Sequence, residues 1–350
     1  MIGKIIAGLA LAVAANAYAA DAKPVQIAEN APDRHVVVPG DTLWGISAMF
    51  LKDPWRWPEV WRLNSEQIRN PHLIYPGQVV YLDRSDGSPR LRLGKAVGGT
   101  VKLEPKVYET SISSAIASIP QQVIEPFLTR PLVVEPDFNQ SAPKIIATDE
   151  NRVWLSAGDS AFVTGLQGDQ TRWQAFRPAR PIKDPATKEV LGYEAQYLGE
   201  LRLLRSGDPA ELRVLTAREE IGRNDRLVPA EPSQVISYVP HAPETSPDGK
   251  VLQILDGVLQ AGRYSVLLIN RGRDAGLEVG HVLATYRDGE VARYRDDQKV
   301  TNYRLPAQRT GLIFVFRVYD RLSYALVMNS YKALQVGDHV VKPDVEYAGR

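Results

Sequence analysis

The chain of 350 residues contains no cysteine. Disulfide bonds, cysteine nucleophiles and the acylated cysteine of a lipoprotein are therefore excluded. An excess of charge of either sign is also missing. The chain has 42 lysines and arginines and 41 aspartates and glutamates, which gives a formal net charge of +1. A chain with almost no net charge has no long-range attraction to nucleic acid, so we expect no nucleic-acid partner.

Long hydrophobic runs are absent except near the N-terminus. There an apolar stretch from Ile5 to Ala15 follows Lys4 and precedes Ala17-Tyr18-Ala19. A membrane anchor needs about 20 apolar residues, more than this stretch provides. The pattern instead predicts a cleaved secretory signal peptide over residues 1–20, and no transmembrane segment in the mature chain.

Histidines are few and scattered, and none pairs with another at the spacing of a zinc peptidase motif. We expect solvent-facing turn histidines at these positions: His35, His72, His241, His281 and His339. The sequence therefore supports no metal and no cofactor.

Other catalytic constellations are equally weak. Glu219-Glu220 is the most suggestive carboxylate pair, but it directly precedes the turn-like run Gly222 to Asp225 and is expected to be a charged surface corner. No serine lies in a G-x-S-x-G elbow. We predict that the chain is not an enzyme.

The most informative block covers residues 34–83. A β-branched strand from His35 to Val38 ends at the turn dipeptide Pro39-Gly40. Asp41 is expected to cap a first helix, whose apolar residues Leu43, Ile46 and Phe50 recur at helical spacing. The block therefore starts as a strand followed by an amphipathic helix.

A second helix and strand complete the block. Asp53 is expected to cap this helix, with Pro54 at its first position. Pro76-Gly77 then marks a turn into a strand from Val79 to Leu82. Of the four tryptophans, Trp44, Trp57 and Trp61 are expected in the core, whereas Trp55 is the best candidate for an exposed ring.

This block resembles a lysin motif (LysM) domain, a module that binds N-acetylglucosamine-containing glycans of peptidoglycan or chitin. The resemblance rests on Val38 to Ile46, on Asn64, on Asn70-Pro71 and on Ile74 to Gln78. It departs from the shortest members in the Trp-rich segment from Lys52 to Pro58.

The resemblance implies a shallow glycan groove between the first turn and the loop before the second strand. Its predicted residues are Gly40, Asp41, Thr42, Leu43, Leu73, Ile74 and Tyr75. Gly40 would allow close backbone approach, Thr42 would offer a hydroxyl, and Leu43 or Ile74 would pack on a sugar face. Two alternatives stay open, namely that Asp41 only caps the helix and that the glycines only serve turns.

The rest of the chain divides by composition. Residues 84–144 are expected to form a cation-rich linker with short helices interrupted at Pro120 and Pro126. Residues 145–232 and 251–345 read as two β-rich repeats, joined by a flexible linker over residues 233–250.

Three pairs of segments suggest a duplicated unit. Gly158-Asp159 is matched with Gly280-His281, the run 199–204 with 311–316, and the closing segment 224–229 with 337–343. Short strands with tight turns favour two small barrels or sandwiches. The overall prediction is an α+β protein with an N-terminal strand–helix–helix–strand domain and two duplicated, mainly β units.

The duplicated half, with the LysM-like block, resembles exported LysM-containing proteins of Gram-negative bacteria. Leu191 to Ala195 and Ser323 to Val327 carry this resemblance. It implies a periplasmic protein that binds peptidoglycan without cleaving it and tethers its β-rich half to the wall. The alternative is an envelope assembly scaffold, in which the β-rich repeats bind a protein partner and the LysM domain is only an anchor.

Overall fold

The computed structural model describes residues 24–62, 74–83, 90–94, 118–128, 133–149, 152–168, 170–230, 239–255, 259–296, 299–347 and 349. The chain divides into two compact units, Met1–Ile116 and Ala117–Arg350. The predicted signal peptide lies outside the described residues. Within those residues, no helix has the length and apolar character needed to cross a membrane.

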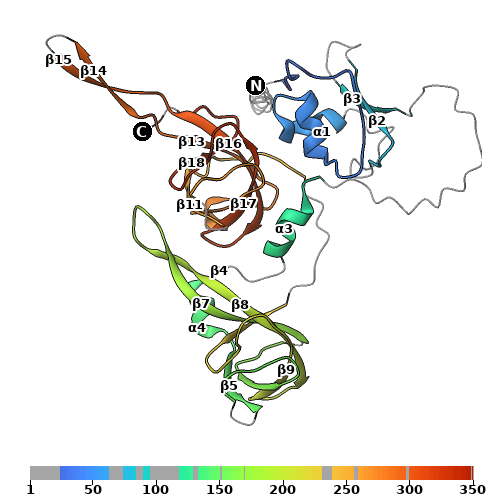
Figure 1. Cartoon of the computed structure of the whole chain (residues 1–350), viewed down its shortest axis with the longest axis vertical. Helices are drawn as coiled ribbons and strands as arrows, with labels where there is room; N and C mark the ends of the chain where they lie inside the picture. Colours follow the sequence, from blue (N-terminus) through green and yellow to red (C-terminus); the bar gives the residue numbers. More distant parts are fainter. Residues whose placement is uncertain are drawn as a thin grey trace, which may run out of the picture. The chain divides into compact units, whose positions relative to one another are not determined.

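The first unit contains a three-stranded antiparallel sheet and two short helices (Figure 1). Its elements are β1 (Arg34–Val36), α1 (Leu43–Phe50), the 3-10 helix η1 (Pro54–Arg56), α2 (Trp57–Arg62), β2 (Val79–Asp83) and β3 (Arg90–Gly94). The predicted strand–helix–helix–strand order is confirmed, and the sheet order β1-β2-β3 adds one more strand.

Strand β3 lies where the sequence predicted only a solvated linker. Leu91 is fully buried in the core of the first unit. Arg92, expected to be a linker cation, forms an ion pair with Asp83, with Nε 2.7 Å from a carboxylate oxygen. The cations of this segment obscured a strand that alternates them with leucines.

The core of the first unit packs α1 and α2 against the sheet. Leu43, Ile46 and Phe50 are buried as their spacing predicted, and so are Trp44 and Trp57. The expectation for Trp55 is wrong, because its side chain is only 5% exposed. Pro54 opens η1 rather than α2, and this tighter turn places Trp55 among buried residues.

The second unit begins with α3 (Gln121–Leu128), β4 (Val133–Val134) and α4 (Pro136–Ser141). The predicted interruption at Pro126 is wrong, since α3 continues through it. A proline removes one backbone donor and disturbs the preceding turn. Here it lies near the end of a short helix, where few hydrogen bonds remain to be lost.

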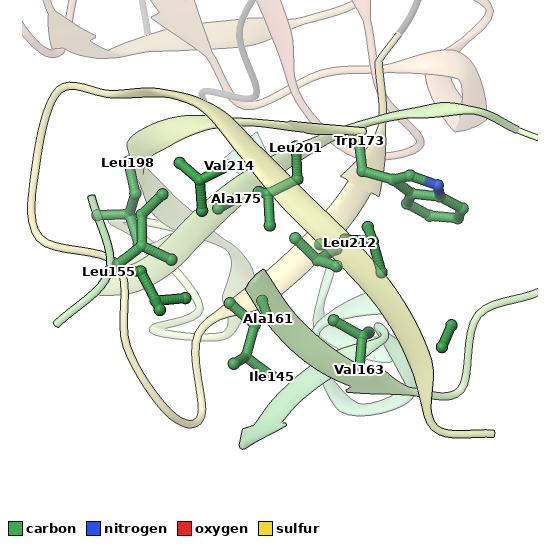
Figure 2. Close-up of a cluster of buried hydrophobic side chains, with 13 residues drawn as sticks. Ile145, Leu155, Ala161, Val163, Trp173, Ala175, Leu198, Leu201, Leu212 and Val214 are labelled. Atoms are coloured by element: carbon green, nitrogen blue, oxygen red, sulfur yellow. The ribbon is translucent and has the colours of Figure 1, made fainter. Parts of the chain in front are cut away.

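The first β-rich repeat closes into a barrel. Its strands are β5 (Lys144–Thr148), β6 (Ser160–Thr164), β7 (Arg172–Lys183), β8 (Val190–Arg205), β9 (Ala210–Ala217) and β10 (Arg226–Pro229). The order β8-β7-β10-β5-β6-β9 becomes a ring through the additional β8–β9 pairing. Figure 2 shows buried side chains such as Ile145, Val163, Leu201 and Leu212 pointing toward one another inside it.

The second repeat is a closed barrel of the same topology. Its strands are β11 (Gly249–Ile254), β12 (Val266–Ile269), β13 (Val282–Arg287), β16 (Gln308–Val318), β17 (Ser323–Ser330) and β18 (His339–Val341). The ring order β11-β12-β17-β16-β13-β18 matches β5-β6-β9-β8-β7-β10 strand for strand. The duplication is therefore confirmed, the units are barrels rather than sandwiches, and the α+β class is confirmed.

One of the three predicted segment matches is wrong. Gly158 precedes β6, the second strand of its barrel, whereas Gly280 precedes β13, the third strand of its barrel. The residue that corresponds to Gly158 is Tyr264, because their N–H groups bond to the equivalent carbonyls of Val214 and Val327. The matches of β8 with β16 and of β10 with β18 hold.

Candidate functional site

Two turns of one type form the predicted glycan-binding region. Each is a four-residue turn, here called an acceptor turn, in which the fourth side chain accepts a hydrogen bond from the first backbone N–H. In Val38–Asp41 the Asp41 carboxylate accepts from Val38 at 2.9 Å, and in Tyr75–Gln78 the Gln78 amide oxygen accepts from Tyr75 at 2.9 Å. The third residues, Gly40 and Gly77, have φ of 94° and 92°, a conformation that favours glycine.

The acceptor turn corrects the predicted role of Asp41. Asp41 does not cap α1; the cap is Thr42, whose Oγ1 accepts from the N–H of Gly45 at 3.0 Å. The Oδ2 of Asp41 instead holds the turn and lies 2.8 Å from Nε2 of His35. A Val-Pro-Gly-Asp-Thr sequence offers two adjacent acceptors, and the turn takes the first of them.

The structure brings the two acceptor turns next to each other. Val37 donates to the carbonyl of Gln78 at 2.8 Å and accepts from the N–H of Gly77 at 2.8 Å. The turn with Gly40, Asp41, Thr42 and Leu43 therefore borders the one that begins at Tyr75. Leu73, the remaining loop residue of the predicted site, lies outside the described residues.

The predicted site residues differ in what they offer a ligand. Leu43 and Ile74 are fully buried, so the prediction that their side chains pack on a sugar face is wrong. Gly40 and Gly77 are exposed, with no atom within 4 Å of where a Cβ would stand. Tyr75 is 36% exposed and is the aromatic ring of this region that remains accessible.

Acceptor turns recur in both barrels and explain several residues there. They span Ser156–Asp159, Gly222–Asp225, Gly262–Ser265, Glu278–His281 and Gln335–Asp338. Asp225 and Asp338 are buried, and each also accepts two hydrogen bonds from one arginine: Asp225 from Arg177, and Asp338 from Arg287. These carboxylates therefore stabilise the barrels.

One cluster in the second barrel has the composition of a metal site. Ligand atoms of His241, Glu278 and His281 lie within 4.8 Å of one another, and the two imidazole rings are 4.7 Å apart. His281 is buried, which contradicts the prediction of a solvent-facing turn histidine. Burial, together with His241, lowers the pKa of His281 to about 4, so the ring is neutral at pH 7.

A hydrogen bond already uses the lone pair of His281 in this cluster. Nδ1 of His281 accepts from the N–H of Glu278 at 3.1 Å, which leaves the proton of the neutral ring on Nε2. Nδ1 of His241 faces the carbonyl of Val239 at 3.0 Å. To bind His281, a metal would have to displace the proton on its Nε2 or break the turn from Glu278 to His281. The arrangement is therefore that of a hydrogen-bonded turn.

Two further groups weighed as enzymatic candidates lie in the two barrels. Glu219 and Glu220 are exposed beside the Gly222 turn, as predicted for a surface corner. His339 bonds to Asp288 at 3.0 Å and to Tyr347 at 3.1 Å.

Comparison with known proteins identifies the first unit. A LysM domain family matches residues 35–83, the segment that holds both adjacent turns, α1 and α2. The chain contains a LysM domain. LysM domains bind carbohydrate and are not catalytic, so the chain carries a glycan-binding module.

The chain is also similar to an uncharacterized protein, YqbP, of Bacillus subtilis (strain 168). The identity is 36%, and the alignment covers 14% of this chain and 27% of the relative. The chain thus spans much less than two thirds of that relative, and the similarity leaves the two barrels unexplained.

Proposed function

We propose that the chain binds N-acetylglucosamine-containing strands of peptidoglycan through its LysM domain, without cleaving them. The observation that carries the proposal is the contact between the two acceptor turns through Val37, which sets exposed Gly40 and Gly77 beside Tyr75. Neutral sugars need backbone donors and acceptors together with an apolar face, and this region supplies both.

Each exposed group has a distinct task in this proposal. The backbone at Gly40 and Gly77 approaches the acetamido groups closely, since no side chain stands in the way. The Thr42 hydroxyl, whose oxygen accepts from Gly45, still has a proton to donate to a sugar. Leu43 and Ile74 contribute through their backbone, and the Tyr75 ring packs on a sugar face.

Titration with a chito-oligosaccharide tests this assignment. Tyr75→Ala should weaken binding by about 1 kcal/mol, the scale of an aromatic packing contact. Tyr81→Ala is a matched control, because Tyr81 is equally exposed at 36% but lies on β2. If both variants lost equal binding affinity while thermal melts showed a folded domain, the placement of the sugar against Tyr75 would be contradicted.

The predicted signal peptide supports a periplasmic location for this activity. Peptidoglycan lies outside the cytoplasm, so a binding module of this kind acts only after export. Fractionation of cells that express the full sequence tests this part, since a chain retained in the cytoplasm with residues 1–20 uncleaved would contradict it.

A further inference from the structure

Each barrel carries an extended hairpin at the same position of its fold. The first arm, residues 178–195, consists of the end of β7, the start of β8 and the turn between them, and the second arm, residues 288–307, connects β13 to β16. Both start from an arginine that faces a glutamine: Arg177 pairs with Gln196, and Arg287 with Gln308. The two arms are therefore equivalent elements of the duplication.

The first arm docks on the second barrel. Oδ2 of Asp184 accepts from Nδ2 of Asn270 at 2.7 Å in a buried contact. Glu189 accepts two hydrogen bonds from Arg321, at 2.6 and 2.8 Å. Near them, a Cβ at Gly192 would lie 3.2 Å from Leu322. This arm thus joins its own barrel to the one that follows.

The second arm forms the separate two-stranded sheet of β14 (Val291–Asp296) and β15 (Lys299–Arg304), visible in Figure 1. Its residues Val291, Tyr294 and Tyr303 are 57%, 59% and 55% exposed. The two tyrosine rings lie on one face, 6.5 Å apart. Two-stranded hairpins are marginally stable in water unless they pack on something, and exposed aromatic rings suit such packing.

The first barrel has the loop that corresponds to the receiving surface. Ile269 of β12 pairs with Ser323 of β17, and the equivalent residue Val163 of β6 pairs with Ala210 of β9. Ser323 therefore corresponds to Ala210, and Arg321, two residues earlier, corresponds to Asp208. The loop around Asp208 is exposed, and the Asp208 carboxylate accepts from Thr164.

The receiving residue has the opposite charge in the two barrels: it is Arg321 in the second barrel and Asp208 in the first. In the first arm, Glu189 accepts a hydrogen bond from Arg321 of the receiving loop. In the second arm, exposed Arg293 and Arg295 stand on the face opposite Tyr294 and Tyr303, and the residue of the first barrel that corresponds to Arg321 is Asp208. The arginine face of the second arm is therefore opposite in charge to the Asp208 carboxylate of the first barrel.

We propose that the second arm of one chain docks on the first barrel of another copy, repeating between chains the joint that the first arm makes within one. Such an interface joins two different surfaces, so it propagates into a ring or a filament rather than stopping at a symmetric dimer. The barrels would then present several LysM domains together on the wall, which raises avidity.

Sedimentation velocity with the full chain tests the proposal through two variants. The arm variant carries Tyr294→Ser and Tyr303→Ser on one face and Arg293→Ser and Arg295→Ser on the other, and the loop variant carries Asp208→Arg. We expect the unmodified chain to grow in mass with concentration, whereas each variant alone stays monomeric. Tyr331→Ser, on an exposed tyrosine outside the arm, is the control and should associate like the unmodified chain.

Mixing the two variants distinguishes this interface from a symmetric one. The arm variant keeps an intact loop and the loop variant keeps an intact arm, so the mixture should form dimers and nothing larger. An unmodified chain that stays monomeric up to its solubility limit would overturn the proposal. So would an arm variant that associates as well as the control, or a mixture that stays monomeric.

Discussion

The buried carboxylates of the acceptor turns offer a matched test of what stabilises the two barrels. Asp225 receives the N–H of Gly222 at 2.7 Å and both Nε and Nη2 of Arg177 at 2.7 Å. Asp338 receives the N–H of Gln335 at 3.0 Å and Nε and Nη2 of Arg287 at 2.9 and 3.0 Å. Substituting either aspartate by asparagine keeps an acceptor for the turn but removes the negative charge.

The expected loss follows from the burial of the two partners. Breaking a buried ion pair costs about 3–5 kcal/mol when the remaining charge cannot reach water. The arginine side chains are 38% and 34% exposed and can recover some hydration, so we expect the low end, about 3 kcal/mol, for Asp225→Asn or Asp338→Asn. Alanine should cost about 1 kcal/mol more, because the turn N–H is then left without its acceptor.

Urea unfolding monitored by circular dichroism measures these losses. Asp159→Asn is the control, because Asp159 holds an acceptor turn but pairs with a half-exposed Arg152, and its loss should stay below about 1 kcal/mol. Equal losses at positions 159, 225 and 338 would refute the argument from burial, as would losses below about 1 kcal/mol at both buried sites.

Three further outcomes follow from the same contacts. Thr42→Ala should lower the stability of the LysM domain by about 1 kcal/mol in thermal melts, since Thr42 caps α1. Gly40→Ala should cost about 1–2 kcal/mol in the same assay, because its φ is positive. Burial would raise the Asp184 pKa, but hydrogen bonds from Asn270 and from backbone amides outweigh it and hold the pKa below its usual value. The Asp184 contact therefore stabilises the barrel joint at pH values above the usual carboxyl pKa and is lost as the pH falls through the lowered pKa. Hydrogen exchange in the first arm should rise as the contact is lost. Asp184→Asn should remove this pH dependence.

The sequence predicted the LysM fold and the duplication because both rest on repeated local signals. Pro39-Gly40 and Pro76-Gly77 mark turns that only certain residues adopt, and the apolar spacing of α1 fixes its buried face.

The errors arose where one residue type serves two local structures. Asp41 and Thr42 are both good helix caps, and only the hydrogen bond from Val38 shows which one the turn uses. Every acceptor turn has a third residue with positive φ followed by an acceptor side chain, so this local pattern also fits the wrong turn of the second barrel, and Gly158 was matched with Gly280. The burial of Trp55 depends on the 3-10 helix η1, which apolar spacing does not indicate.

Co-sedimentation of the full chain with purified peptidoglycan sacculi tests the central claim most directly. We expect the chain to pellet with the sacculi, Tyr75→Ala but not Tyr81→Ala to shift it toward the supernatant, and no soluble muropeptides to appear. A folded chain that stays in the supernatant would contradict glycan binding, and release of muropeptides would contradict a binding role without cleavage.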